Sequence, residues 1–196
     1  MSGCPVRCKF CATGQMKRWR NLTAQEIIDQ VEFVISRNPE FNPENSKEFK
    51  INYTRMGEPF LNINNVKEAI QILNKKYPYL HHYVSTVGIN NSDFSWIVDN
   101  ITLQVSLHST DESSRDWLIP YKNKMSIKKL GQIRNRSYLK TTINLTLVKE
   151  EDFDIEVLKK YFDKDYFFVK ISPINPNDNS SKYDMGDGII DGKNLI

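Results

Sequence analysis

Three cysteines stand close together near the start of the sequence, in the spacing Cys4-x-x-x-Cys8-x-x-Cys11, and the 196 residues contain no other cysteine. An odd number of clustered thiols is a poor set for disulfide bonds, and the usual explanation is ligation of a metal ion or an iron–sulfur cluster. Three thiolates leave one iron of a four-iron cluster without a protein ligand, and chemistry can take place at such an open position. The triplet therefore predicts a metal centre that can act on a substrate.

A structural zinc ion is the alternative occupant of these thiols. Zinc needs a fourth nitrogen or sulfur ligand, which His81, His82 or His108 could supply. Structural zinc cysteines usually come as C-x-x-C pairs, whereas this set is a single triplet with an aromatic residue, Phe10, before its last cysteine. The spacing favours an iron–sulfur cluster over zinc.

Polar residues that could bind a ligand follow the predicted strands. The turn Gly57-Glu58-Pro59 ends a strand expected at residues 50–56, and its carboxylate and carbonyl groups can accept hydrogen bonds from an ammonium group. Ligands of parallel α/β folds bind at the carboxyl ends of the strands. Helix capping or turn formation would explain such residues one at a time, and His108 could equally orient a loop. As a series they favour cofactor contacts, and they are Ser85, Ser106, His108 and Asn175.

Basic residues occur at two further places of interest. The run Lys17-Arg18-Trp19-Arg20 suits an anionic or nucleic-acid substrate, and it suits a solvated surface equally well. Lys170, in the last predicted strand, faces the interior of the sheet if the strand alternates regularly and marks a bend if it does not.

The elements that must position these residues alternate between helical and strand patterns. Thr23 and Glu26 form a capping box for a helix over residues 24–35. Further helices are expected at residues 66–73, 94–98, 127–138 and 155–162, and strands at 50–56, 82–87, 101–108, 141–148 and 167–173. Repeated β–α units predict a parallel sheet.

The strands alternate between apolar and polar residues, which separates an open doubly wound sheet from a curled one. Ile101, Leu103, Val105 and Leu107 share one face, while Thr102, Gln104, Ser106 and His108 share the other. Strands covered by helices on both faces would be apolar throughout. A curled sheet with helices outside and a polar interior fits instead, so we expect an α/β fold, a partial (βα) barrel of about five mostly parallel strands.

Composition sets the remaining expectations. Residues 1–176 are predicted to form one domain, and the Asn-, Asp-, Ser- and Gly-rich residues 177–196 a weakly ordered tail. The formal net charge of +3 neither indicates nor excludes a nucleic-acid partner. No apolar run is long enough for a membrane span and no signal segment is recognisable, so no membrane partner is expected. Clustered thiols fit a reducing cytoplasm.

The cysteine spacing resembles the signature of the radical S-adenosylmethionine (SAM) superfamily. Within that superfamily, segments in order along residues 3–176 resemble the RlmN/Cfr-type methylases, which methylate a ribosomal RNA adenosine. The segments are Cys4-Pro-Val-Arg-Cys8-Lys-Phe-Cys11-Ala-Thr-Gly14, Asn21-Leu22-Thr23-Ala24, Met56-Gly57-Glu58-Pro59-Phe60-Leu61-Asn62, Ser106-Leu107-His108, Arg115-Asp116 with Ile119-Pro120, and Pro173-Ile174-Asn175-Pro176.

The resemblance implies a cofactor set and an activity. It implies a 4Fe–4S cluster on Cys4, Cys8 and Cys11, with SAM chelating the remaining iron. Reduction of the cluster by a one-electron donor of the flavodoxin or ferredoxin type would then cleave SAM to a 5′-deoxyadenosyl radical that abstracts hydrogen from a substrate such as RNA or a nucleotide. The implied SAM contacts are Gly57, Glu58, Ser85, Ser106, Leu107, His108 and Asn175; no further catalytic residue is assigned.

Departures from the resembled family are equally informative. Those methylases carry an RNA-binding domain and a first barrel strand before the cluster loop, and two further cysteines, one of which carries the methyl group. Here every cysteine belongs to the triplet, so a methylcysteine relay is not expected within this sequence. An uncovered sheet edge is a liability, which predicts a partner chain, a second copy or the tail at that edge, or else a truncated version of a longer protein.

Three hypotheses follow from these residues. The leading one is a radical SAM enzyme with a minimal RlmN/Cfr-like core. The second is a catalytically incomplete module that binds cluster and cofactor and acts through a partner chain. A zinc-stabilised α/β domain is the third.

Overall fold

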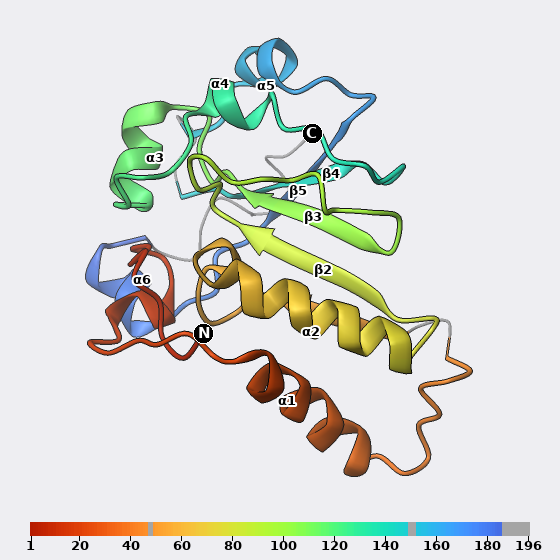
Figure 1. Cartoon of the computed structure of the whole chain (residues 1–196). Helices are drawn as coiled ribbons and strands as arrows, with labels where there is room; N and C mark the ends of the chain where they lie inside the picture. The colour runs from red at the N-terminus through yellow and green to blue at the C-terminus, as the bar shows by residue number, and fades with distance from the viewer. Residues whose placement is uncertain (47–48, 149–151, 186–196) are drawn as a thin grey trace.

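The structure is a computed structural model that describes residues 1–46, 49–148 and 152–185. Within these ranges five strands form one parallel sheet in the order β1-β2-β3-β4-β5, so neighbours in sequence are neighbours in space (Figure 1). The strands are β1 (Lys50–Tyr53), β2 (His81–Thr86), β3 (Ile101–Ser106), β4 (Thr141–Thr146) and β5 (Phe167–Ser172). The predicted five-stranded, partial (βα) barrel is confirmed.

Helical segments precede, join and follow the strands. They are η1 (Ala12–Gln15), α1 (Ala24–Ser36), η2 (Pro59–Asn62), α2 (Ile63–Lys76), α3 (Glu112–Leu118), α4 (Ile127–Leu130), α5 (Ile155–Tyr161) and α6 (Asp178–Lys182). The predicted capping box begins α1: the Thr23 side chain accepts from the Glu26 backbone N–H at 3.2 Å, and the Thr23 N–H donates to the Glu26 carboxylate at 2.9 Å. In Figure 1, α2 lies beside β2 and α1 lies beside α2, while α4 and α5 lie at the β4–β5 end of the sheet.

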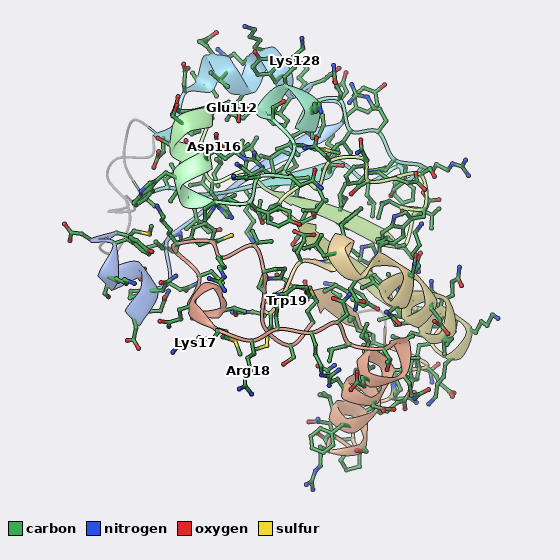
Figure 2. The ribbon with its side chains drawn as sticks, turned by 60° about the vertical axis from the view of Figure 1, so that its left-hand side comes forward. Lys17, Arg18, Trp19, Glu112, Asp116 and Lys128 are labelled. Carbon is green, nitrogen blue, oxygen red and sulfur yellow. The ribbon has the colours of Figure 1, made fainter. Side chains whose placement is uncertain are left out.

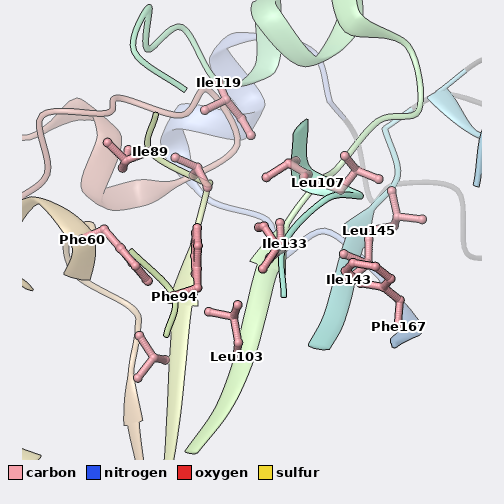
Figure 3. Packing of buried hydrophobic residues seen from close by; sticks show 14 of the residues in the cluster. Phe60, Ile89, Phe94, Leu103, Leu107, Ile119, Ile133, Ile143, Leu145 and Phe167 are labelled. Carbon is pink, nitrogen blue, oxygen red and sulfur yellow. The ribbon is translucent and has the colours of Figure 1, made fainter. Parts of the chain in front are cut away.

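The two faces of the sheet differ as the alternation predicts. Along β3 and β4, every second residue is buried and the residues between are half-buried. The buried set includes Leu103, Val105, Ile143 and Leu145, each no more than 1 % exposed. It packs with residues from the helices in one cluster, part of which Figure 3 shows. In β3 and β4 the other face carries polar residues, which is the arrangement a curled sheet needs.

Two expected helices differ from the observed structure. The helix expected at 127–138 ends at Leu130. Gly131 follows, packed closely against the Tyr161 carbonyl, and Asn135 then turns the chain by accepting from the Ser137 N–H at 3.0 Å. Residues 94–98 form turns and no helix. There the Asp93 carboxylate accepts from the Ser95 N–H at 2.8 Å, and such local side-chain bonds compete with helix formation.

The segment predicted as a weakly ordered tail begins with structure. Residues 178–182 form α6, Ser180 is 1 % exposed and Met185 is 3 % exposed within the main core cluster. Burial of Met185 and the capping side chain of Asn177 stabilise a segment whose composition looks disordered. Residues 186–196 lie outside the described residues, and the division at residue 176 stays a prediction.

Candidate functional site

The cysteine loop is a tight turn that closes on its own backbone. The Cys11 N–H donates to the Cys8 carbonyl at 3.2 Å, and the Gly14 N–H donates to the Cys11 carbonyl at 2.9 Å. Glycine is required at position 14, because a Cβ there would collide with the Cys8 carbonyl oxygen. Arg7 adopts a left-handed conformation, with φ of 60°, which is rare for a long side chain. The loop is therefore compact and locally strained.

Other elements fasten this loop to the carboxyl end of the sheet. The Lys9 N–H donates to the carbonyl of Leu118 at the end of α3, at 2.9 Å. The Thr13 hydroxyl donates to the Arg55 carbonyl, just after β1, at 3.2 Å. The three cysteines thus lie at the end of the sheet where the strands end.

The thiols of Cys4, Cys8 and Cys11 are free and partly buried. Burial, followed by repulsion from the Cys11 and Cys4 thiolates and from Glu58, raises the pKa of Cys8 well above its usual value. Burial likewise raises the pKa of Cys4. Three thiolates crowded in this way need positive charge beside them, and a bound metal centre deprotonates its thiols outright. The donor set fits a cationic cluster.

A single metal ion is less well served by this site. Over residues 1–46, 49–148 and 152–185, no three His, Cys, Asp or Glu side chains converge as ligands of one ion. In a 4Fe–4S cluster each thiolate binds its own iron, so the thiols need not converge on one point.

Two of the histidines considered as zinc ligands, His81 and His82, lie away from the cysteines and contact other polar side chains. His82 is fully buried, with Nδ1 3.2 Å from the Tyr53 hydroxyl and Nε2 2.9 Å from the Asn74 side-chain oxygen. His81 Nε2 lies 2.8 Å from the Thr102 hydroxyl. Both residues begin β2, at the end of the sheet opposite to the cysteine loop.

His108, by contrast, lies against the cysteine loop. Its ring meets the Phe10 ring edge-on with centroids 4.5 Å apart, and its Nδ1 accepts from the Thr146 N–H at 3.1 Å. Burial, and secondly the nearby Arg115, lowers the pKa of His108 to about 3, so the ring is neutral. With a backbone φ of 63°, His108 joins the ends of β3 and β4 to the loop. Of the two roles expected for it, loop orientation is the one with visible contacts.

The Gly57-Glu58-Pro59 turn is held by its own carboxylate. Glu58 is 3 % exposed; its Oε1 accepts from the Phe60 N–H at 3.0 Å and its Oε2 from the Val87 N–H at 2.8 Å. Burial raises the pKa of Glu58 to about 7, against the effect of these bonds. The carboxylate therefore ties the turn to the end of β2, and it is near enough to Cys4 and Cys8 to raise their pKa values.

Gly57 and Met1 lie in contact at the same rim. Gly57 has φ of 101°, a conformation that favours glycine, and a Cβ there would stand 2.5 Å from the Met1 Cβ. The Glu58 N–H donates to the Met1 sulfur at 3.3 Å.

Polar side chains line the inner face of the sheet in two rows across the strands. In one row the Ser85 hydroxyl donates to the Gln104 side-chain oxygen at 2.8 Å. In the other, Ser106 pairs with Asn144, which pairs with Lys170. Lys170 therefore faces the interior, the first of the two orientations considered for it.

The remaining predicted contacts lie on the strand-end loops. Leu107 is fully buried, and its N–H donates to the Asn144 carbonyl at 2.9 Å. Asn175 is exposed, and its carbonyl accepts from the Asn177 side chain at 2.9 Å. The structure thus brings the strand-end residues to one rim, with Ser85 and Ser106 farther inside.

Arg115 is a buried residue of this site that no hydrophobic or ligand pattern in the sequence indicates. It is fully buried on α3 and donates to the carbonyls of Val87 and Met125, at 2.7 Å each, while its Nε has no partner among the residues that the structure describes. Burial lowers the pKa of Arg115 to about 10. It lies near Cys8 and His108, so it adds positive charge beside the thiols. In the sequence, Arg115 appears only within the segment Arg115-Asp116, which resembles the RlmN/Cfr-type methylases.

Comparison with known proteins identifies the fold family. A family profile described as "Radical SAM superfamily" matches residues 1–162. The chain belongs to the radical SAM superfamily. Among curated relatives, a probable dual-specificity RNA methyltransferase RlmN of Pseudothermotoga lettingae is 36% identical over 186 residues, covering 88% of this chain and 52% of the relative. The corresponding protein of Thermosipho melanesiensis is 34% identical over 191 residues, covering 89% and 53%.

This radical SAM core resembles RlmN, as the sequence motifs predict, and it spans about half the length of these relatives. A solved structure, that of TYW1 with a lysine-pyruvate adduct bound, superposes with a TM-score of 0.57 at 16% identity and covers 88% of this chain and 62% of that one. At this identity the superposition supports the fold alone.

A large groove follows the open edge of the radical SAM sheet. A cavity of about 1090 Å³ runs between β1 and α1, from Phe41 to the Gly57 turn, and apolar residues of α1 such as Ile27 and Val31 line one side. It lies at the edge where the sequence predicts a covering segment.

The basic run at residues 17–20 lies on the surface. Arg20 forms an ion pair with Glu26 at 2.7 Å, while Lys17, Arg18 and Trp19 are exposed near one another on the N-terminal segment (Figure 2). No helix in the described part of the chain is both long and apolar enough to cross a membrane.

Proposed function

We propose that this chain is a radical SAM enzyme that binds a 4Fe–4S cluster through Cys4, Cys8 and Cys11. The observation that carries the proposal is the crowding of three free thiols in a compact loop at the carboxyl edge of a radical SAM sheet, where burial raises the pKa values of Cys4 and Cys8. When bound and reduced, the cluster supplies the electron that cleaves SAM to a 5′-deoxyadenosyl radical.

The chain's own residues would bind and shield SAM at this rim. We assign the cofactor contacts to Gly57, Glu58, Ser85, Ser106, Leu107, His108 and Asn175. The Glu58 carboxylate and the His108 Nδ1 already accept hydrogen bonds from backbone N–H groups. These two residues therefore act mainly by fixing the shape of the rim. The inner rows that contain Ser85 and Ser106 supply hydroxyl groups to a ligand in the interior.

We propose RNA as the substrate class, because the relatives carry the name RNA methyltransferase. Lys17 and Arg18, which flank the cluster loop, would meet an anionic substrate. A methylcysteine relay has no carrier within these 196 residues, since all three cysteines are assigned to the cluster. The reductant we expect is a one-electron donor of the flavodoxin or ferredoxin type, in the cytoplasm.

The test is anaerobic reconstitution with iron and sulfide, followed by reduction with dithionite in the presence of SAM. We expect a brown protein with about four irons per chain and release of 5′-deoxyadenosine, measured by mass spectrometry. Cys8→Ala should abolish both signals. Full iron loading of the wild type without any 5′-deoxyadenosine would refute radical chemistry.

A second function, a cluster- and cofactor-binding module that acts through a partner chain or a second copy, is favoured by the groove along β1. Light scattering after size-exclusion chromatography distinguishes the two. A monomer with cleavage activity would exclude the partner-dependent module.

A further inference from the structure

Asn179, in α6, holds the cysteine loop from outside. Its side-chain amide donates to the Cys11 carbonyl at 3.0 Å and to the Cys8 carbonyl at 3.3 Å. Asn179 is 7% exposed, so water competes little for these bonds. Both donors of one amide group thus bridge two residues that we assign as cluster ligands.

Asn177 extends the same contact to the strand end. Its side-chain amide donates to the Phe10 carbonyl at 3.0 Å and to the Asn175 carbonyl at 2.9 Å. Its side-chain oxygen faces the other way and caps α6, accepting from the N–H groups of Asn179 and Ser180 at 3.0 and 3.2 Å. One residue therefore connects the cysteine loop, α6 and a proposed SAM contact.

The segment that carries both asparagines is anchored independently of these bonds. Met185 is buried in the main core cluster. The Tyr183 ring meets the Trp117 ring edge-on at 5.9 Å, and the Lys9 ammonium lies 4.0 Å from the Trp117 centroid. Figure 1 shows α6 against the N-terminal loop, from which it is far in sequence.

These contacts have a specific physical consequence. On its own, the loop is closed by short-range backbone bonds, which a strained turn with Arg7 at positive φ can readily exchange for water. Ligand sites bind tightly when their donor atoms are held in place before the ligand arrives. Carbonyls fixed by buried amides hold the backbone from which Cys8 and Cys11 project.

We propose that Asn179 and Asn177 are positioning residues that keep the cysteine loop in its ligand-binding conformation, and that Asn177 also couples the loop to the SAM-binding strand end. The part concerning cluster retention rests on the proposed function. The part concerning the loop conformation does not.

The test uses Asn179→Asp, Asn179→Ala and Asn177→Asp in the full chain. Aspartate keeps the size and, at position 177, the helix cap, but removes both amide donors. Asn64→Asp, on the exposed side of α2, is the matched control for the change in charge. Asn179→Ala separates loss of the donors from the added charge.

Hydrogen exchange of the cluster-free protein measures the loop directly. We expect the amides of Cys11 and Gly14 to exchange at least about tenfold faster in both Asn179 variants, since each lost bond is worth about one kilocalorie per mole. Amides of β3 and β4 should keep their wild-type rates, and Asn64→Asp should match the wild type throughout. Unchanged loop rates in both Asn179 variants, or equal acceleration across the whole sheet, would overturn the proposal.

Retention of the cluster and affinity for SAM test whether the position of the loop matters for ligand binding. In reconstituted protein, we expect iron loss to a chelator to become about tenfold faster or more in both Asn179 variants, while Asn177→Asp lowers SAM affinity more than cluster retention. Faster loss in Asn179→Asp alone would assign the effect to charge and contradict positioning. If the wild type binds no cluster, the proposed function fails, whereas the exchange comparison still decides whether the asparagines hold the loop.

Discussion

His82 makes the stability of this fold depend on pH. Its Nε2 lies 2.9 Å from the Asn74 oxygen, which cannot donate, so Nε2 carries the proton and Nδ1 accepts from the Tyr53 hydroxyl. Burial, and secondly the nearby His81, lowers the pKa of His82 to about 4. Its unfolded value is about 6.5, so between these values the unfolded chain binds more protons and stability falls as pH falls.

The magnitude follows from the two pKa values. Linkage from pH 7.5 to pH 5 gives a loss of about 2 kcal/mol from His82 alone, at 1.36 kcal/mol per pH unit within the window. Glu58 acts in the opposite direction, because its pKa is raised to about 7 in the folded protein and its protonation there favours folding as pH falls. His108 adds a loss of the same sign as His82. Wild-type stability alone therefore does not isolate His82.

A comparison with His82→Gln isolates it, since Glu58 and His108 contribute equally to both proteins. We expect the variant to be less stable than the cluster-free wild type at pH 7.5, and this deficit to shrink by about 2 kcal/mol at pH 5. Urea unfolding followed by circular dichroism measures both values. A deficit that stays constant within about 0.5 kcal/mol, inside the extrapolation error, would refute the reasoning and indicate that His82 titrates normally in the folded state.

Three further substitutions test other parts of the structure. Gly14→Ala should push the Cys8 carbonyl aside and abolish iron uptake on reconstitution, while the circular dichroism spectrum stays that of a folded protein. Arg115→Ala should lower the free energy of unfolding by about 2–5 kcal/mol, because it leaves the buried carbonyl of Val87 and the part-buried carbonyl of Met125 without their donor; urea unfolding measures it. Thr23→Ala should cost about 1 kcal/mol by the same assay through loss of the cap of α1.

The strands and long helices could be predicted because their signals are local. The alternation of apolar residues in β3 and β4 indicates a strand from residues only a few positions apart. The capping box at Thr23 likewise indicates the start of a helix. The seven-residue α3 was missed because its buried members include Arg115, which a hydrophobic pattern does not reveal. The polar α6 was missed because its partners, the carbonyls of Cys8 and Cys11, lie about 170 residues earlier in the sequence.

The same distinction applies to the site. The strand-end series located the rim, because the carboxyl ends of parallel strands meet at one edge. What each side chain does there depends on partners from other strands. Glu58 and His108, two ionisable residues of this rim, have their acceptors engaged by the backbone at Val87, Phe60 and Thr146. Besides the three thiols, the rim therefore presents mainly hydroxyl, amide and main-chain groups to a ligand. Under the proposed function, this rim holds SAM and the inner face selects the substrate, where Lys170 supplies the one lysine or arginine of the two cross-strand rows described above.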